Sequence, residues 1–145
     1  MIGLLLSVME CLAQPAYTPY TFSTFLGSAG QPGSEDGTGG AARFSYPAAV
    51  AVGSGGTVYV VEYSYALRKA TPEGVVTTLP VGLDNPAGVA VDNGSNIYVA
   101  NTFDHTIVKV TPEGIATTLA GVSRSEGSED GMGNVARFYY PSGVA

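Results

Sequence analysis

Residues of the types that perform catalysis or bind metal ions are scarce in this sequence. His105 is the only histidine and Cys11 the only cysteine among 145 residues. A zinc or calcium centre usually draws several histidine or carboxylate ligands from different parts of a fold. A single imidazole is better explained by packing or local hydrogen bonding, and we expect no catalytic residue, no metal site and no cofactor in this chain.

A pair of acidic turns is the second candidate for a site. The sequence Gly-Ser-Glu-Asp-Gly at 33–37 recurs at 127–131, and Ala-Arg-Phe at 42–44 recurs at 136–138, both at an offset of 94 residues. Two carboxylates beside backbone carbonyls could bind calcium, although calcium loops use more ligands. We favour a structural role, in which the aspartates cap the turns and the arginines pair with neighbouring carboxylates to close the loops. The residues concerned are Asp36, Arg43, Asp130 and Arg137.

The charge balance argues against nucleic acid as a partner. Six Lys and Arg residues stand against twelve Asp and Glu residues, a formal net charge of -6, and the cations are scattered along the chain. Such a chain repels a phosphate backbone unless its cations gather on one face. We therefore expect no binding to nucleic acid, and anionic membrane surfaces are disfavoured for the same reason.

The N-terminal residues predict export from the cytoplasm. Residues 1–13 combine an apolar run with small residues near Ala13, which is typical of a secretion signal, and 14–21 would be a linker. After cleavage nothing in the chain would insert into a membrane, so the expected location is secreted or periplasmic. A buried N-terminal strand is the alternative interpretation of the same residues.

Composition and internal repetition predict which secondary-structure elements hold these candidate residues. Twenty Gly, nine Pro and nine Tyr with no Trp are typical of short strands joined by tight turns, which predicts an all-β fold. Pro-Ala-Ala-Val-Ala-Val at 47–52 recurs in similar form at 86–91 and begins again at 141–145. Each repeat of about 40 residues holds four apolar runs of strand length, the pattern of one four-stranded antiparallel β-propeller blade. The predicted strands are 48–52, 57–61, 66–70, 75–79, 87–91, 96–100, 106–110 and 115–119.

These repeats predict an incomplete propeller over 22–145. Complete blades are expected at 47–79 and 86–119, with the last strand of a preceding blade at 22–26 and the first strand of a following blade at 141–145. A closed ring needs about 16 to 32 strands, so this chain falls short of closure. The favoured explanation is a piece of a longer protein, and self-assembly of copies to complete a propeller is the alternative.

The second repeat resembles the NHL repeat, a propeller blade named for an Asn-His-Leu stretch. The resemblance lies in Asp104-His105-Thr106-Ile107, with Ile97-Tyr98-Val99-Ala100-Asn101 before it and Lys109-Val110-Thr111-Pro112-Glu113-Gly114 after it. The first repeat keeps Leu67-Arg68-Lys69 but lacks the histidine. The resemblance implies a propeller fold with His105 in the turn that enters the third strand. It leaves function open, because NHL propellers serve as binding platforms, as RNA-binding modules and, in related six-bladed forms, as metal-dependent lyases or hydrolases.

The expected function is that of a non-catalytic binding or scaffold module whose loops on one propeller face engage a protein, peptide or glycan. The alternative is a fragment of a metal-dependent six-bladed lyase or hydrolase whose other ligands lie outside this chain. Enzymatic activity is therefore undecided at this point, and its absence is favoured. Several tyrosines could line a carbohydrate or peptide groove, with packing between blades as the other interpretation. They are Tyr20, Tyr46, Tyr63, Tyr65, Tyr139 and Tyr140.

Overall fold

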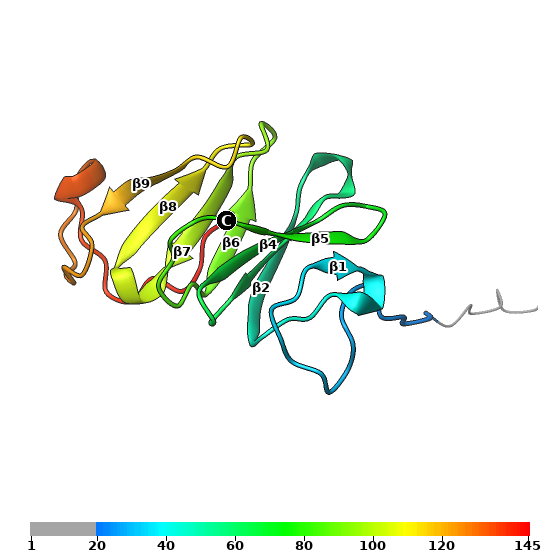
Figure 1. Ribbon diagram of the computed structural model, residues 1–145. Helices are drawn as coiled ribbons and strands as arrows, with labels where there is room; N and C mark the ends of the chain where they lie inside the picture. The colour runs from blue at the N-terminus through cyan, green and yellow to red at the C-terminus, as the bar shows by residue number, and fades with distance from the viewer. Residues whose placement is uncertain (1–19) are drawn as a thin grey trace, which may run out of the picture.

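The computed structural model describes residues 20–145 (Figure 1). The predicted signal peptide at 1–13 and most of the predicted linker at 14–21 lie outside the described residues. Within 20–145, no helix is long and apolar enough to cross a membrane.

The first sheet is an antiparallel meander of four strands with a short fifth strand at its outer edge. The strands β2 (Pro47–Val52), β3 (Val58–Glu62), β4 (Ala66–Ala70) and β5 (Val75–Leu79) pair in sequence order, and β1 (Gly37–Thr38) pairs with β5. We call β2 to β5 blade 1. A one-turn 3-10 helix, η1 (Gly39–Ala41), follows β1, and η2 (Ser54–Gly56) links β2 to β3.

The second sheet repeats this topology. The strands β6 (Gly88–Val91), β7 (Ile97–Asn101), β8 (Thr106–Val110) and β9 (Ala116–Gly121) again pair in sequence order, and we call them blade 2. The 3-10 turn η3 (Thr102–Asp104) links β7 to β8, and η4 (Gly133–Val135) lies in the long segment after β9.

All eight strands predicted for the two complete repeats form, with bounds within two residues of those expected. The turns between them explain the good agreement. Gly74 and Gly114, which end the repeated Thr-Pro-Glu-Gly turns, have φ of 85° and 86°. Glycine adopts this left-handed conformation without steric cost, so the turn residues mark where each strand must end.

The larger of two apolar core clusters among residues 20–145 lies between the two sheets. Val61 and Leu67 of blade 1 and Val99 of blade 2 are each fully buried in it. The core is completed by Tyr59, Val81, Leu83, Val89, Ile97, Val108 and Val110. Two consecutive four-stranded antiparallel sheets packed in this way are neighbouring blades of a propeller, which confirms the predicted fold class (Figure 1).

The two flanking strands were predicted wrongly, because neither 22–26 nor 141–145 forms a strand. Residues 22–27 occupy the place in the repeat that β9 occupies 94 residues later, and β9 pairs with β8. Within residues 20–145, no strand pairs with 22–26, and a strand needs ladder hydrogen bonds to a neighbour.

The segment 141–145, which we call the C-terminal segment, lies against blade 2 without pairing. The Thr102 hydroxyl donates a hydrogen bond of 2.8 Å to the Pro141 carbonyl. At Gly88 an added Cβ would lie 2.8 Å from the Ser142 carbonyl oxygen and 2.9 Å from the Gly143 Cα, so a glycine is needed for this approach. The C-terminal segment therefore runs beside β6, at the position where the innermost strand of a further blade would begin (Figure 1).

Candidate functional site

Arg68 in β4 is the most heavily bonded side chain near the acidic turn 33–37. It is 1% exposed. Its Nη1 donates to the Arg43 carbonyl at 2.8 Å and its Nη2 to the Glu35 carbonyl at 3.0 Å. Nη2 also forms an ion pair of 2.9 Å with Asp36, and the guanidinium carbon lies 5.1 Å from the centre of the Phe44 ring. This arginine thus links both ends of the loop 33–44 to blade 1.

Glu62 at the end of β3 is the buried counter-charge of this arginine. Its side chain is 0% exposed and lies 3.4 Å from Arg68 Nη1. The same carboxylate accepts hydrogen bonds from the Ser45 N–H at 3.1 Å and the Ser64 hydroxyl at 3.2 Å. A buried charge is tolerated only with such partners, so Glu62 and Arg68 depend on each other.

Asp36 connects the same loop to the outer strand of blade 1. Its carboxylate accepts hydrogen bonds from the Thr78 N–H at 3.1 Å and the Thr78 hydroxyl at 2.8 Å. Partial burial acts to raise the pKa of Asp36, but the two bonds from Thr78 and the Arg68 guanidinium outweigh it and hold the pKa below its ordinary value. Asp36 is therefore bonded across to β5 and does not cap its own turn.

The predicted pairing of Arg43 and Arg137 with carboxylates is wrong. In the described part of the chain, neither side chain has a carboxylate within ion-pair distance. Arg43 donates to the Ala42 carbonyl at 2.8 Å and to the Gln31 side chain at 2.9 Å, and Arg137 donates to the Ala136 carbonyl at 2.9 Å. These guanidinium groups fold back on their own loops, because loop carbonyls near η1 and η4 are closer than any acidic group.

The loop 127–138 repeats the backbone of loop 33–44. The Gly33 N–H donates to the Phe44 carbonyl at 3.2 Å, and the Gly127 N–H donates to the Phe138 carbonyl at 3.1 Å. The N–H of each loop arginine donates at 2.9 Å to the carbonyl of the loop glutamate. Asp130 corresponds to Asp36, and no hydrogen bond or ion pair reaches the Asp130 side chain from residues 20–145.

His105 is occupied by structural contacts. It is 6% exposed and has a φ of 56°, in the turn between β7 and β8. Its Nδ1 accepts a hydrogen bond of 3.2 Å from the Tyr140 N–H, and its ring lies 4.6 Å from the Tyr140 ring. Its Nε2 lies 4.0 Å from the Glu126 carboxylate. The predicted packing role fits these contacts, although the partners are distant in sequence.

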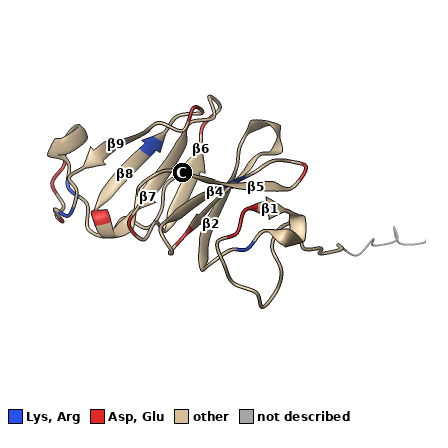
Figure 2. Ribbon diagram, in the orientation of Figure 1, with Lys and Arg blue, Asp and Glu red and all other residues tan. Residues whose placement is uncertain are grey.

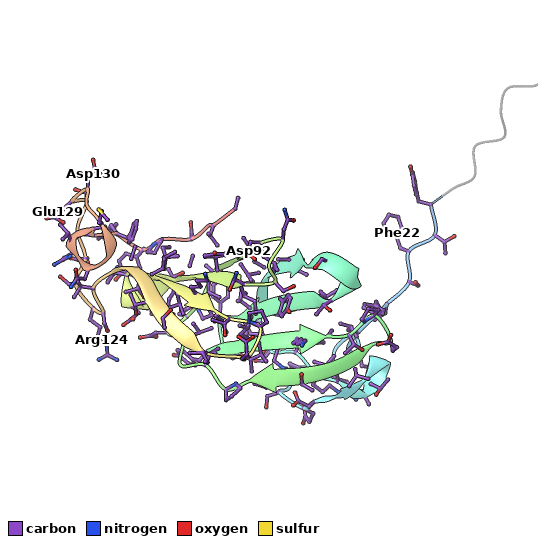
Figure 3. The ribbon with its side chains drawn as sticks, turned by 90° about the horizontal axis from the view of Figure 1, so that it is seen from above. Phe22, Asp92, Arg124, Glu129 and Asp130 are labelled. Atoms are coloured by element: carbon purple, nitrogen blue, oxygen red, sulfur yellow. The ribbon has the colours of Figure 1, made fainter. Side chains whose placement is uncertain are left out.

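No arrangement of ligands suited to a metal ion is found in the part of the chain that the structure describes. Groups of three or more His, Cys, Asp or Glu side chains do not occur there. Asp36 is bonded to Arg68 and Thr78, while Glu129 and Asp130 project at the end of the molecule far from blade 1 (Figure 3). The structure thus does not bring the two acidic turns together.

Exposed aromatic side chains gather at one end of the blades. They lie in the turns that precede β2 or the C-terminal segment and in those that link the second and third strands of a blade, and each is 44% to 76% exposed. The Tyr63 N–H donates to the Tyr46 carbonyl at 3.0 Å, which places two of these turns side by side. The rings of Phe103 and Tyr140 lie 5.7 Å apart. We call this set the aromatic rim: Tyr46, Tyr63, Tyr65, Phe103, Tyr139 and Tyr140.

A hollow of about 890 Å³ lies on the face of blade 1 turned away from blade 2. Its lining is mostly apolar and includes Leu26, Phe44 and Val50. Val50 is 62% exposed, whereas its repeat counterpart Val89 is 8% exposed under blade 1. The difference shows how much surface one neighbouring blade buries. The hollow therefore lies where a preceding blade would pack against blade 1.

The sequence interpretation missed Arg68 and Glu62, the two charged side chains that organise the loop. The available signal was an arginine inside a predicted strand, at a position where the second repeat has Val108. A charged residue that replaces an apolar one in such a strand indicates a paired buried charge. Figure 2 shows Lys and Arg residues at separate places on both blades and on both long loops.

No known protein family and no curated protein matches this sequence. Solved structures do match. A structural genomics protein of unknown function from Bacteroides thetaiotaomicron VPI-5482 has a TM-score of 0.55 and 22% identity over 61% of this chain and 26% of its own. Virginiamycin B lyase from Staphylococcus aureus has a TM-score of 0.47 and 22% identity over 52% of this chain and 27% of its own. A streptogramin B lyase has a TM-score of 0.45 and 17% identity over 50% of this chain and 25% of its own.

This chain thus spans about a quarter of the length of each of these proteins. At these identities the likeness concerns the fold alone.

Proposed function

We propose that this chain belongs to an extracytoplasmic β-propeller of the NHL kind and acts as a non-catalytic binding module. Its ligand is a protein, peptide or glycan that contacts the aromatic rim. The rim carries the proposal, because it is a set of exposed aromatic side chains on turns at the same end of two packed blades.

The chemistry of the rim suits an extended ligand with flat apolar faces. Tyrosine offers a large apolar ring with a polar hydroxyl and only two side-chain torsions, so it binds with little loss of conformational entropy. Rigid placement supports this use, since the Tyr63 and Tyr46 backbones are bonded to each other and Tyr140 packs on His105. Sugars and peptide side chains both present surfaces that stack on such rings.

The test is binding of the full chain to a glycan array and to a random peptide library displayed on phage. The double variant Tyr63→Ala with Tyr65→Ala should weaken binding of a hit by about tenfold or more, as expected for loss of an aromatic anchor. Phe22→Ala is the matched control, because Phe22 is 95% exposed on the N-terminal stretch that stands away from both blades (Figure 3). Equal affinities for the rim variant and the control would contradict the proposal.

The same binding assay, repeated with added calcium or zinc, distinguishes a non-catalytic binding module from the alternative, a fragment of a metal-dependent enzyme. A hit that binds equally well in the presence of a chelator supports the binding module. A strict metal requirement with turnover of the ligand would overturn it. The proposed export is tested separately by mass spectrometry of the mature N-terminus, where cleavage after Ala13 is expected.

A further inference from the structure

We propose that the loop 127–138 is a preformed docking surface for another propeller blade, one that presents an arginine from its third strand. The proposal does not depend on the ligand of the aromatic rim. It follows from an internal comparison, because the chain contains the same loop twice, once seated on such a blade and once without one.

Loop 33–44 is the copy that is bound to a blade, and its contacts with blade 1 define the docked arrangement. Three acceptors of this loop surround the Arg68 guanidinium: the Arg43 carbonyl, the Glu35 carbonyl and the Asp36 carboxylate. The Phe44 ring lies against the same guanidinium at 5.1 Å. The loop also adds β1 to the edge of blade 1, where Gly37 pairs with Val76.

Loop 127–138 holds the equivalent groups in the same conformation. Its glycine at the start of the 3-10 turn, Gly133, has a φ of 55°, and the corresponding Gly39 has a φ of 54°. The Phe138 ring lies 3.2 Å from the Cβ position of Gly121, as the Phe44 ring lies 3.1 Å from that of Gly27. Equal backbone bonds and equal ring placement mean that the two backbone carbonyls and the aromatic face are positioned before any partner arrives, whereas the Asp130 carboxylate would be fixed on docking.

The acidic residue that would receive the arginine, Asp130, is exposed. Figure 3 shows Glu129 and Asp130 projecting at the end of the molecule opposite to blade 1. Met132 and Val135 on the same loop are 89% and 60% exposed. A carboxylate, two carbonyls and an aromatic face together complement a guanidinium, which prefers several acceptors in one plane and stacks on aromatic rings.

The rest of blade 2 supports a blade as the occupant. The C-terminal segment already lies beside β6 at Gly88, where the innermost strand of the next blade belongs. Ile107 of β8 is only half-buried, whereas its counterpart Leu67 is 0% exposed between the two blades. A blade that continues from the C-terminal segment would cover this face and bring its third strand to the loop.

The test is a double-mutant cycle in an extended chain. A second copy of residues 52–83 is joined after Ala145, where it continues the repeat that the C-terminal segment begins, and it supplies an arginine that corresponds to Arg68. The control extension carries valine at that position and asparagine in place of the paired glutamate, the residues that blade 2 has as Val108 and Asn101, so that no buried charge is left without its partner. Asp130→Asn is introduced into the original chain and into both extended chains, and urea unfolding is measured for each.

In the arginine extension, Asp130→Asn should raise the unfolding equilibrium constant by about tenfold, as expected for a charge-assisted hydrogen bond. In the valine extension and the original chain it should change the constant less than about twofold. Equal effects of Asp130→Asn in the two extensions would overturn the proposal.

Amide hydrogen exchange and sedimentation provide two readouts besides urea unfolding. Amides of 127–138 should exchange more slowly in the arginine extension than in the original chain. Unchanged exchange would overturn the proposal. So would a dimer of the original chain that Asp130→Asn dissociates, since the surface would then belong to a second copy.

Discussion

Replacement of Arg68 tests whether one buried arginine holds the loop 33–44 on blade 1. Arg68→Met keeps most of the apolar stem and removes the guanidinium. It leaves Glu62, whose side chain is 0% exposed, with two neutral donors and no counter-charge. It also removes the bonds to the Arg43 and Glu35 carbonyls. Loss of one member of a buried ion pair costs about 3–5 kcal/mol, and we expect a decrease of this size in the free energy of unfolding.

The assay is urea unfolding at neutral pH, followed by far-ultraviolet circular dichroism. Lys69→Met is the matched control, because it removes the neighbouring cation of the same strand from a partly exposed site, with an expected change below about 0.5 kcal/mol. The double variant Glu62→Gln with Arg68→Met removes the stranded charge and should recover part of the loss. A single variant within about 1 kcal/mol of the parent, or a double variant no more stable than the single one, would refute the reasoning.

Three further outcomes are expected. Gly88→Ala should displace the C-terminal segment, because the new Cβ would meet its backbone atoms at 2.8 and 2.9 Å. Amide hydrogen exchange of 141–145 should become faster. Gly82→Ala is the control and should leave this exchange unchanged, because nothing lies within 4 Å of its Cβ position. Val89→Ala should lower the free energy of unfolding, measured in urea, by about 2 kcal/mol, since Val89 is 8% exposed. Val50→Ala should lower it by less than about 0.5 kcal/mol, since Val50 is 62% exposed. Because the folded-state pKa of Asp36 lies below its unfolded value, its contribution to stability is present above about pH 4 and is lost as the pH falls through the folded-state pKa. Asp36→Asn should therefore flatten the acid side of the stability profile, and an unchanged acid slope would argue against the Thr78 and Arg68 contacts.

The strands could be predicted because two independent local signals agree in this sequence. Apolar runs of strand length alternate with turns whose glycines need a positive φ, as at Gly74 and Gly114, and the second copy of each signal fixes the register of the first. The segments 22–26 and 141–145 carry the same apolar pattern but form no strand. A strand is completed by hydrogen bonds to a neighbour, and repetition within one segment does not say whether that neighbour is present.

The loop contacts could not be predicted from spacing. Arg43 lies closer in sequence to Asp36 than Arg68 does, yet Arg68 forms the ion pair because β4 passes under the loop. His105 was expected to make local contacts, and its partner Tyr140 lies 35 residues away on a returning segment. Contacts that depend on how a loop folds back over a sheet leave no periodic trace in the sequence.

The duplication of loop 33–44 as loop 127–138 has a consequence for copies of the chain in solution. The surface of blade 1 around Arg68 is already occupied by loop 33–44 of the same polypeptide. The short chain connection between the loop and the blade gives the loop an effective concentration of roughly millimolar. The corresponding loop of a second molecule must compete with it at its bulk concentration. Exchange of these loops between neighbouring copies is therefore disfavoured at micromolar protein concentration. A higher protein concentration, or a substitution of Asp36 that weakens the attachment of loop 33–44, would promote it.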